Sequence, residues 1–353
     1  MTLLKVGLSG IMRVKNEALF LERCVASCIN ALDELVIVYN DCTDGSDIII
    51  KKLESAYPAK IRVYEYPHHI YGVGLSAEEY EIARNLPEDS PNLLCSYYNF
   101  ALSKVTYQYA IKIDADQIYF SDVLEHYRNI CKGTTSECPW SHRMLGWLFQ
   151  FYLSAFRRIS VETNQVIPLM PKCLARSFSR IYRNYAIRQF LLGRACLSFS
   201  GLNVFEEGEK TYVSLGFKND IFNILPPFNG EGDHVLFKVT PEVHFRRFEM
   251  PYYNNLRSTS YSIIEEFVHP YRIMPVGFLW KHINAQRPEY RNVVEQVRKA
   301  YPQKYMLLGD FFKASWRNIV LNSDINMFTI YQRALFSFVY KAYGQDLKKF
   351  LEC

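Results

Sequence analysis

The sequence contains no apolar run long enough to cross a membrane and no recognisable secretion signal. Its longest notable charge-free apolar stretch, Met144–Phe156, is shorter than the roughly 20 residues that a spanning helix requires. The early apolar run Val6–Met12 is not followed by a small-residue cleavage site, which favours a strand over a signal peptide. No C-x-x-C pair occurs among the nine cysteines, so free, reduced thiols are the simplest interpretation. We therefore expect a cytoplasmic protein without a spanning segment.

The sequence also has no internal repeat and no strong excess of charge. A net charge of +5 on 353 residues is modest for a nucleic-acid-binding protein. Hydrophobic residues make up 49% and charged residues 22%, which argues against a disordered, collagen-like or coiled-coil chain. Aromatic residues reach 15%, which suits either stacking on ring-shaped ligands or a core of large side chains. The length suits two domains, or one large domain with an appendage.

The first 65 residues alternate between buried strands and amphipathic helices. Such a β-α-β-α-β pattern is typical of half of a nucleotide-binding sheet. Asn16 is placed to cap the first helix. The expected strands are Val6–Val14, Leu35–Tyr39 and Ile61–Tyr66, and the expected helices follow Asn16 and span Ser46–Tyr57.

The chain after residue 66 leads through a loop, a helix and a strand to a second polar segment. Residues 67–91 form a long connection that is typical of a mobile or functional loop. A helix over 92–104 and a strand over 109–113 then lead to Asp114 and Asp116. Ligands of open α/β sheets bind beyond the carboxyl ends of the strands, so we expect these carboxylates to share a crevice with the turn Asn40–Asp44.

Two carboxylates one residue apart at a strand end can both face one crevice once the strand bends. They offer hard oxygen ligands to Mg²⁺ or Mn²⁺, and a diphosphate can fill the remaining coordination positions. The alternative is an exposed acidic turn, because a D-x-D pattern alone is common.

Four segments, in order, resemble elements of a family-2-type glycosyltransferase of the GT-A fold. The resemblance spans Val6–Phe248 and implies a GT-A-like α/β fold with a mixed sheet flanked by helices. Ile11–Ile48 is similar to the family's opening segment, Ile111–Asp116 to its D-x-D strand, Phe199–Phe205 to its acceptor-side "GGN" strand and Gly230–His234 to its "ED" element.

The resemblance implies a UDP-sugar donor, a divalent cation and an inverting transfer to a glycan or lipid-linked acceptor in surface polysaccharide biosynthesis. It leaves Asn40 or Asp41 to bind the base, since the family usually has an acidic pair there. It leaves Asp233 or Glu231 as the catalytic base, because Gly232 separates residues that are adjacent in the family. On the donor side it implies Asp114 for the ribose or the metal, Asp116 and His244 for the metal, and Arg246 and Arg247 for the diphosphate.

The segment Arg143–Arg194 is strongly basic and aromatic, with Glu162 as its single acid. It suits peripheral binding to an anionic membrane on the inner face. A nucleic-acid groove would look similar, and a solvated basic face over an aromatic core is the third interpretation.

The predicted organisation is a catalytic domain over 1–250 and a mostly helical appendage over 251–353. The catalytic domain would consist of a nucleotide-sugar half, 1–135, and an acceptor half, 136–250. Two other functions fit parts of the pattern: a sugar-nucleotide nucleotidyltransferase, and a nucleic-acid-binding protein or a transferase acting on modified nucleic acid. The first is disfavoured because the segment Leu8–Arg13 has one glycine where such enzymes have a glycine-rich loop.

Overall fold

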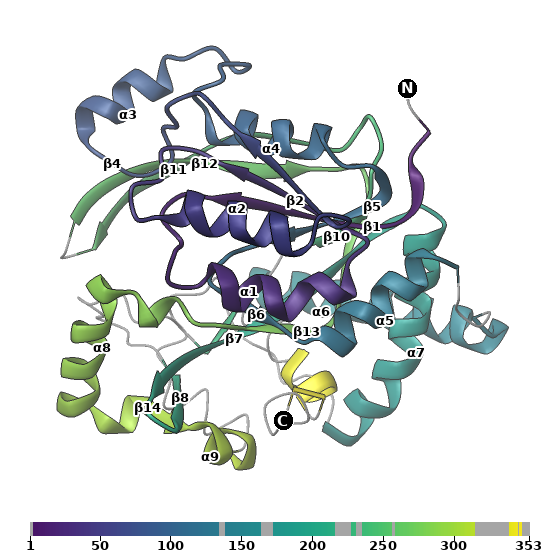
Figure 1. Cartoon of the computed structure of the whole chain (residues 1–353). Coiled ribbons are helices and arrows are strands. Elements are labelled where there is room, and N and C mark those ends of the chain that lie inside the picture. Colours follow the sequence, from purple (N-terminus) through teal and green to yellow (C-terminus); the bar gives the residue numbers. More distant parts are fainter. Residues whose placement is uncertain are drawn as a thin grey trace. The chain divides into compact units, whose positions relative to one another are not determined.

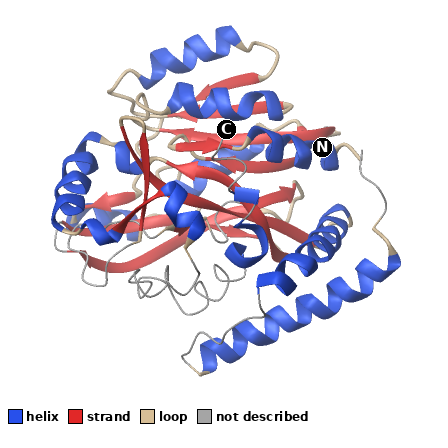
Figure 2. Ribbon diagram, turned by 90° about the horizontal axis from the view of Figure 1, so that it is seen from below, coloured by secondary structure: helices blue, strands red, loops and turns tan. Residues whose placement is uncertain are grey.

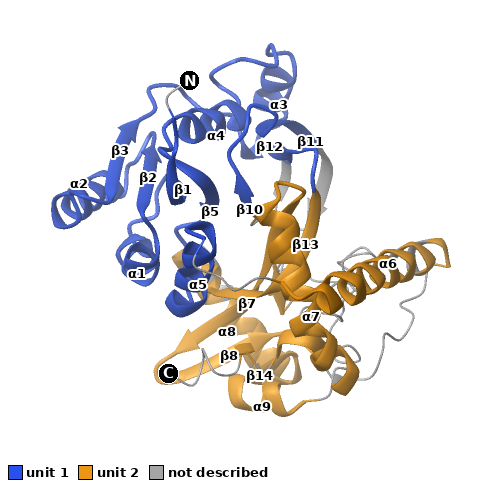
Figure 3. Ribbon diagram, turned by 90° about the vertical axis from the view of Figure 1, so that its right-hand side faces the viewer, with its two compact units in different colours: residues 1–133, 236–271 blue, residues 134–235, 272–353 orange. Residues whose placement is uncertain are grey.

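The computed structural model describes residues 3–133, 138–163, 172–215, 227–230, 235–255, 258–314, 339–344 and 346–347 (Figure 1). The chain folds into two compact units. The first contains residues 1–133 and 236–271, and the second contains 134–235 and 272–353 (Figure 3). These units divide the chain differently from the predicted domains, because residues 236–271 return to the first unit.

The first unit is built on a mixed sheet with strand order β10-β5-β1-β2-β3. Its parallel strands are β5 (Tyr107–Ile113), β1 (Lys5–Val14), β2 (Glu34–Tyr39) and β3 (Ile61–Glu65), and β10 (Val235–Lys238) runs antiparallel to β5. β1 and β2 are almost entirely buried, as expected of parallel strands covered on both faces. The predicted strands of this nucleotide-binding half are confirmed.

Helices flank this sheet (Figure 2), and each contributes buried apolar residues. They are α1 (Leu21–Cys28), α2 (Ser46–Ala56), α4 (Leu94–Ser103) and α5 (Ser121–Cys131). The predicted capping role of Asn16 was wrong. α1 begins after Phe20 without a side-chain cap, whereas the Asn16 side chain accepts a hydrogen bond from the backbone of Thr43. Every cysteine in the described ranges is a free thiol.

The connection after β3 contains regular structure. β4 (Val73–Leu75) precedes α3 (Ala77–Arg84), whose start carries a capping box between Ser76 and Glu79. β4 is the edge strand of a second, antiparallel sheet with β12 (Ser258–Val268) and β11 (His244–Asn255). The predicted loop over 67–91 was therefore wrong for residues 73–84.

The second unit combines a helical pair with a smaller sheet. The helices are α6 (Trp140–Glu162) and α7 (Lys172–Leu191). In the sheet, β7 (Ala195–Glu207) pairs parallel to β13 (Arg272–His282) and antiparallel to β8 (Lys210–Ser214) and β9 (Phe228–Asn229). β8 continues to β14 (Tyr305–Leu307), and α8 (Pro288–Ala300) and α9 (Leu308–Lys313) complete the labelled elements.

The predicted helical appendage over 251–353 was wrong for its first part. β12 and β13 occupy residues 258–268 and 272–282, and the first α-helix after them starts at Pro288. The interior of β13 is buried on both faces. A short run that is apolar on both faces does not distinguish a buried strand from a buried helix, which explains the error.

Candidate active site

The carboxyl ends of the parallel strands lie at one edge of the first unit's sheet. Val14 at the end of β1 is in register with Tyr39 of β2, and Tyr39 is in register with Glu65 of β3. On the other side, Met12 of β1 is in register with Ile113 of β5. The polar turns that follow these strands therefore emerge at the same edge, where open α/β sheets bind their ligands.

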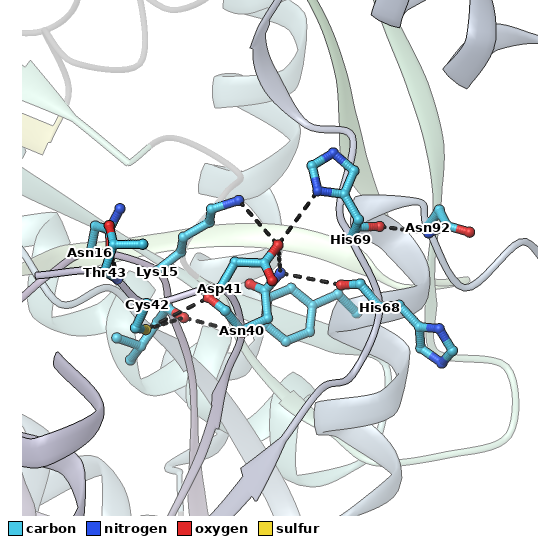
Figure 4. A network of polar contacts seen from close by, with 11 residues as sticks. Lys15, Asn16, Asn40, Asp41, Cys42, Thr43, His68, His69 and Asn92 are labelled. Atoms are coloured by element: carbon cyan, nitrogen blue, oxygen red, sulfur yellow. Dashed lines mark hydrogen bonds and ion pairs between the residues drawn. The ribbon is translucent and has the colours of Figure 1, made fainter. Parts of the chain in front are cut away.

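The turn after β2 holds Asn40 and Asp41 within a network of polar contacts (Figure 4). Asn40 is 1% exposed, and its Nδ2 donates to the carbonyl of His68 at 3.4 Å. The Asp41 side chain is 49% exposed and lies 3.7 Å from Lys15 Nζ and 3.5 Å from His69 Nδ1. Asp41 also has a left-handed backbone with φ of 44°. The structure thus gives the two candidate base-binding residues different environments.

Side-chain hydrogen bonds join the segment after β1 to the turn before α2. Asn16 Oδ1 accepts from Thr43 N at 2.8 Å, and Ser46 Oγ accepts from Glu17 N at 2.8 Å. Asp44 accepts from the backbone of Ala18 and from both the backbone and the hydroxyl of Ser46. Partial burial opposes the charged form of Asp44, but these hydrogen bonds outweigh it and lower its pKa.

The second polar turn follows β5 and holds Asp114 and Asp116, both partly exposed. The backbone N–H of Asp114 donates to Tyr119 Oη at 3.0 Å, and Tyr119 Oη donates to Gln117 Oε1 at 2.7 Å. The Gln117 amide lies 3.5 Å from Asp114 Oδ2. Gln117 stands where the family often has an acid, and as an amide it can donate to Asp114 instead of repelling it. Tyr119 belongs to the short strand β6 (Gln117–Tyr119).

The chemistry of this turn suits a divalent cation. Asp114 and Asp116 are hard oxygen donors one residue apart. Their negative charges also act on the Cys24 thiol, whose pKa is raised well above its usual value, first by burial and then by its neighbours. Within the described ranges, no three His, Cys, Asp or Glu side chains form a metal-binding group. As hard oxygen donors, the two carboxylates fit Mg²⁺ or Mn²⁺, for which a diphosphate or water can supply further ligands.

A buried charged cluster lies behind β5, and the sequence analysis missed it. Lys112 and Glu265 of β12 are almost fully buried and form an ion pair of 3.1 Å. Lys112 Nζ and the Arg13 guanidinium each lie 5.0 Å from the ring centre of Tyr98. Lys112 itself could have indicated the cluster, because a lysine inside an apolar strand rarely stays buried without a charged partner. The sequence did not reveal that the partner comes from residue 265.

His244, Arg246 and Arg247 lie at the start of β11 and have other partners in the structure. His244 is exposed, with Nδ1 3.3 Å from the carbonyl of Glu242. Arg246 donates to Glu266 at 2.6 Å, and Arg247 donates to the carbonyls at the end of α3, Arg84 and Leu86. In the described structure, His244 is not gathered with Asp114 and Asp116 into a metal-binding group. The roles predicted for these three residues stay predictions.

In the second unit, the predicted acceptor-side strand is the buried β7. A Cβ on Gly201 would lie 1.9 Å from Trp280 Nε1, so only glycine allows this approach of β7 to β13. Trp280 Nε1 donates to Asn229 Oδ1 at 3.1 Å, and Gly230 follows with a left-handed φ of 89°. Both candidate bases, Glu231 and Asp233, lie outside the described residues. Gly230, the last described residue before them, lies against the Trp280 ring, where a Cβ would be 2.3 Å from Cζ2.

Residues 6–136 match the model of a family described as Beta-1,4-N-acetylgalactosaminyltransferase (CgtA). The match covers less than half of the chain and contains both polar turns of the first unit. It confirms the predicted resemblance to a glycosyltransferase family over these residues. The first unit also has the expected mixed sheet flanked by helices. Among curated proteins, none matches the chain significantly.

Several solved structures are similar over part of the chain. S. aureus TarS residues 1–349 in complex with UDP-GlcNAc has 16% identity and a TM-score of 0.25, over 37% of this chain and 32% of that one. Glucosyl-3-phosphoglycerate synthase from Mycobacterium tuberculosis, with Mn²⁺, UDP and phosphoglyceric acid, has 17% identity and a TM-score of 0.21, over 32% and 34%. The similarity thus spans about a third of these solved chains.

Proposed function

We propose that the protein is a metal-dependent, inverting glycosyltransferase that transfers a sugar from a UDP-sugar to a glycan or lipid-linked acceptor in surface polysaccharide biosynthesis. The observation that carries the proposal is the pair of polar turns at one edge of the first unit's sheet. One turn holds Asn40 and Asp41, and the other holds Asp114 and Asp116. Both lie within the region that matches the glycosyltransferase family model.

Asp41, rather than Asn40, is our candidate for binding the base. The uracil N3–H is a hydrogen-bond donor, and a half-exposed carboxylate is a suitable acceptor. Asn40 is buried and holds the turn through the His68 carbonyl. Loss of the Asn40 amide would therefore disturb the position of Asp41, whereas loss of the Asp41 carboxylate would remove the contact with the base.

Asp116 and Asp114 would hold Mn²⁺ or Mg²⁺, with Asp114 contacting it through water or binding the ribose instead. When bound, such an ion offsets the negative charge that develops on the leaving diphosphate. His244 is a further candidate ligand, and Arg246 and Arg247 are candidates for the diphosphate. Each of these three would have to exchange its present partner to reach the donor.

The transfer itself needs a base on the acceptor side, for which we propose Asp233, with Glu231 as the rival. The base removes the proton of the acceptor hydroxyl while its oxygen forms a bond to the anomeric carbon. The bond from that carbon to the diphosphate breaks on the opposite face. The products are an inverted glycoside, UDP and the protonated carboxylate.

Calorimetry with UDP tests the donor site. We expect binding in the presence of Mn²⁺ and much weaker binding in chelator, because Asp114 and Asp116 would hold an ion whose charge attracts the diphosphate. Equal affinity with and without metal would contradict the metal bridge. The family description names N-acetylgalactosamine, so UDP-N-acetylgalactosamine is the first donor to test for slow release of UDP.

Two variants test the base. Asp233→Asn should lower kcat by roughly 10²- to 10⁴-fold while UDP affinity stays near wild type. Glu209→Gln, in an exposed turn between β7 and β8, is the matched control. If Glu231→Gln loses activity and Asp233→Asn keeps it, Glu231 is the base. If both stay active, the "ED" resemblance is misleading.

A further inference from the structure

Helix α6 has one face that is packed against α7 within the second unit. Phe149 stacks on Phe178 with ring centres 5.5 Å apart, and the Tyr182 hydroxyl donates to Gln150 Oε1 at 2.8 Å. Gly146 allows the close approach, since a Cβ there would lie 2.3 Å from Tyr185 Cβ. This inner face accounts for only part of the apolar side chains of the helix.

The opposite face of α6 carries large apolar side chains that remain exposed. Trp140 is 71% exposed, Trp147 56% and Phe151 66%. Trp147 and Phe151 stack on each other with ring centres 6.4 Å apart. Spacings of three and four residues place these side chains on one outer stripe. The outer stripe consists of Trp140, Met144, Trp147, Leu148, Phe151, Tyr152 and Ile159.

The same helical pair is strongly basic. Across α6 and α7, Glu162 is the single acid. It pairs with Arg158, and no described carboxylate forms an ion pair with Arg176 or Arg180. The basic residues of the two helices are Arg143, Arg157, Arg158, Lys172, Arg176, Arg180, Arg183 and Arg188.

We infer that α6 binds the surface of an anionic membrane, with its outer stripe inserted at the level of the lipid headgroups. Exposed Trp, Tyr and Phe together with arginines are the composition that interfacial helices use. The aromatic rings suit the boundary between headgroups and acyl chains, and the net positive charge complements anionic lipids. No helix among the described residues is long and apolar enough to span the bilayer.

The aliphatic members of the outer stripe favour lipid over nucleic acid. Met144, Leu148 and Ile159 are each more than two-fifths exposed. They offer no flat face for a base to stack on, whereas acyl chains can cover them. Membrane binding by α6 does not depend on the proposed function. The further idea that this surface brings the enzyme to a lipid-linked acceptor does rest on it.

Vesicle binding by the full chain tests the inference. We expect the protein to sediment with vesicles of mixed phosphatidylglycerol and phosphatidylcholine, and much less with vesicles of pure phosphatidylcholine. High salt should lower the bound fraction severalfold, because salt screens the attraction between surface charges, whose range is already only about 8 Å at physiological ionic strength. Its tryptophan emission should shift to the blue on binding. Trp147→Ser with Phe151→Ser should weaken binding about tenfold or more, since two large apolar side chains no longer insert.

Ile48→Ser is the matched control, because Ile48 is 69% exposed on α2 of the first unit and should not affect vesicle binding. Near-ultraviolet circular dichroism of each variant shows whether it is folded, and UDP calorimetry shows whether its donor site works. Together they distinguish these two failures from a loss of membrane binding. Three results would overturn the inference: no vesicle binding, equal binding to both lipid compositions, or a lipid-free dimer that Trp147→Ser dissociates. Competition by single-stranded oligonucleotide for the same stripe would instead assign it to nucleic acid.

Discussion

The two polar turns at the edge of the first unit's sheet are held in different ways. Apart from the buried Asn40 and Ser46, the turn after β2 is held by exposed or half-exposed groups, including the Asn16–Thr43 hydrogen bond and the Lys15–Asp41 ion pair. The turn after β5 is held by hydrogen bonds of buried side chains: Tyr119 is 3% exposed and Gln117 is 1% exposed. The Lys112–Glu265 ion pair lies on the strand that leads into it.

This difference fits the tasks proposed for the two turns. A group that binds a neutral base needs an accessible acceptor, and exposed contacts can rearrange around the ligand at little cost. Two carboxylates that share a cation must stay close despite their repulsion, which favours a rigid support. We therefore expect substitutions behind the second turn to cost more stability than equivalent substitutions around the first.

The largest effect should come from Asp116→Asn. It would remove the charge of a proposed metal ligand, and we expect turnover to fall by roughly 10³-fold or more, since charge stabilisation by a bound metal is worth several kcal/mol. The thermal unfolding midpoint should stay near wild type, because Asp116 is partly exposed. Asp122→Asn, an exposed aspartate in the first turn of α5, should keep wild-type turnover. Full activity of Asp116→Asn would remove the second turn from the site.

The next effect compares two lysines. Lys112→Gln leaves Glu265 buried without its ion-pair partner, and we expect the free energy of unfolding to fall by about 3 kcal/mol. Lys15→Gln removes an exposed ion pair and should cost less than about 0.5 kcal/mol. Urea denaturation measures both. Equal losses would contradict the contrast between a rigid and an adaptable turn.

The sequence was sufficient for the strands and turns that bear the site. Continuous apolar runs identified β1, β2 and β5, and the polar residues directly after them placed Asp41 and Asp114 at the same edge. These inferences succeeded because each depends on a local pattern together with one rule for parallel sheets. β7 was expected on different grounds, from the resemblance of Phe199–Phe205 to the family's acceptor-side strand.

The supports of the site could not be predicted, because they depend on contacts between distant residues. Lys112 and Glu265 are separated by 153 positions, and β12 was expected to lie in a helical appendage. Asn16 has the residue type of a helix cap, yet its side chain bonds Thr43, 27 positions away. Local preference cannot decide between such partners when tertiary structure offers a competing hydrogen bond.

A smaller effect compares two tyrosine hydroxyls. Tyr119→Phe removes the buried acceptor of the Asp114 N–H and the donor to Gln117, and we expect a loss of about 1–3 kcal/mol in unfolding free energy. Tyr39→Phe removes an exposed contact of 3.4 Å to Glu65 and should change stability by less than about 0.5 kcal/mol. Chemical denaturation of the two variants in parallel provides the test. If Tyr119→Phe is as stable as wild type, the second turn does not depend on its buried hydrogen bonds.

The smallest effect should be the pH response of the first turn. The folded state lowers the pKa of Asp44, so its contribution to stability is present above the unfolded value, about pH 4, and is lost as the pH falls through the folded pKa. Asp44→Asn should therefore be less stable than wild type by about 0.5 kcal/mol near pH 7, after allowance for solvent screening. The difference should shrink toward zero below pH 4, because wild-type Asp44 then becomes neutral as well. Asp89→Asn, an exposed aspartate before α4, should show no such trend. A constant difference across this pH range would mean that shape, rather than charge, lets Asp44 hold the turn.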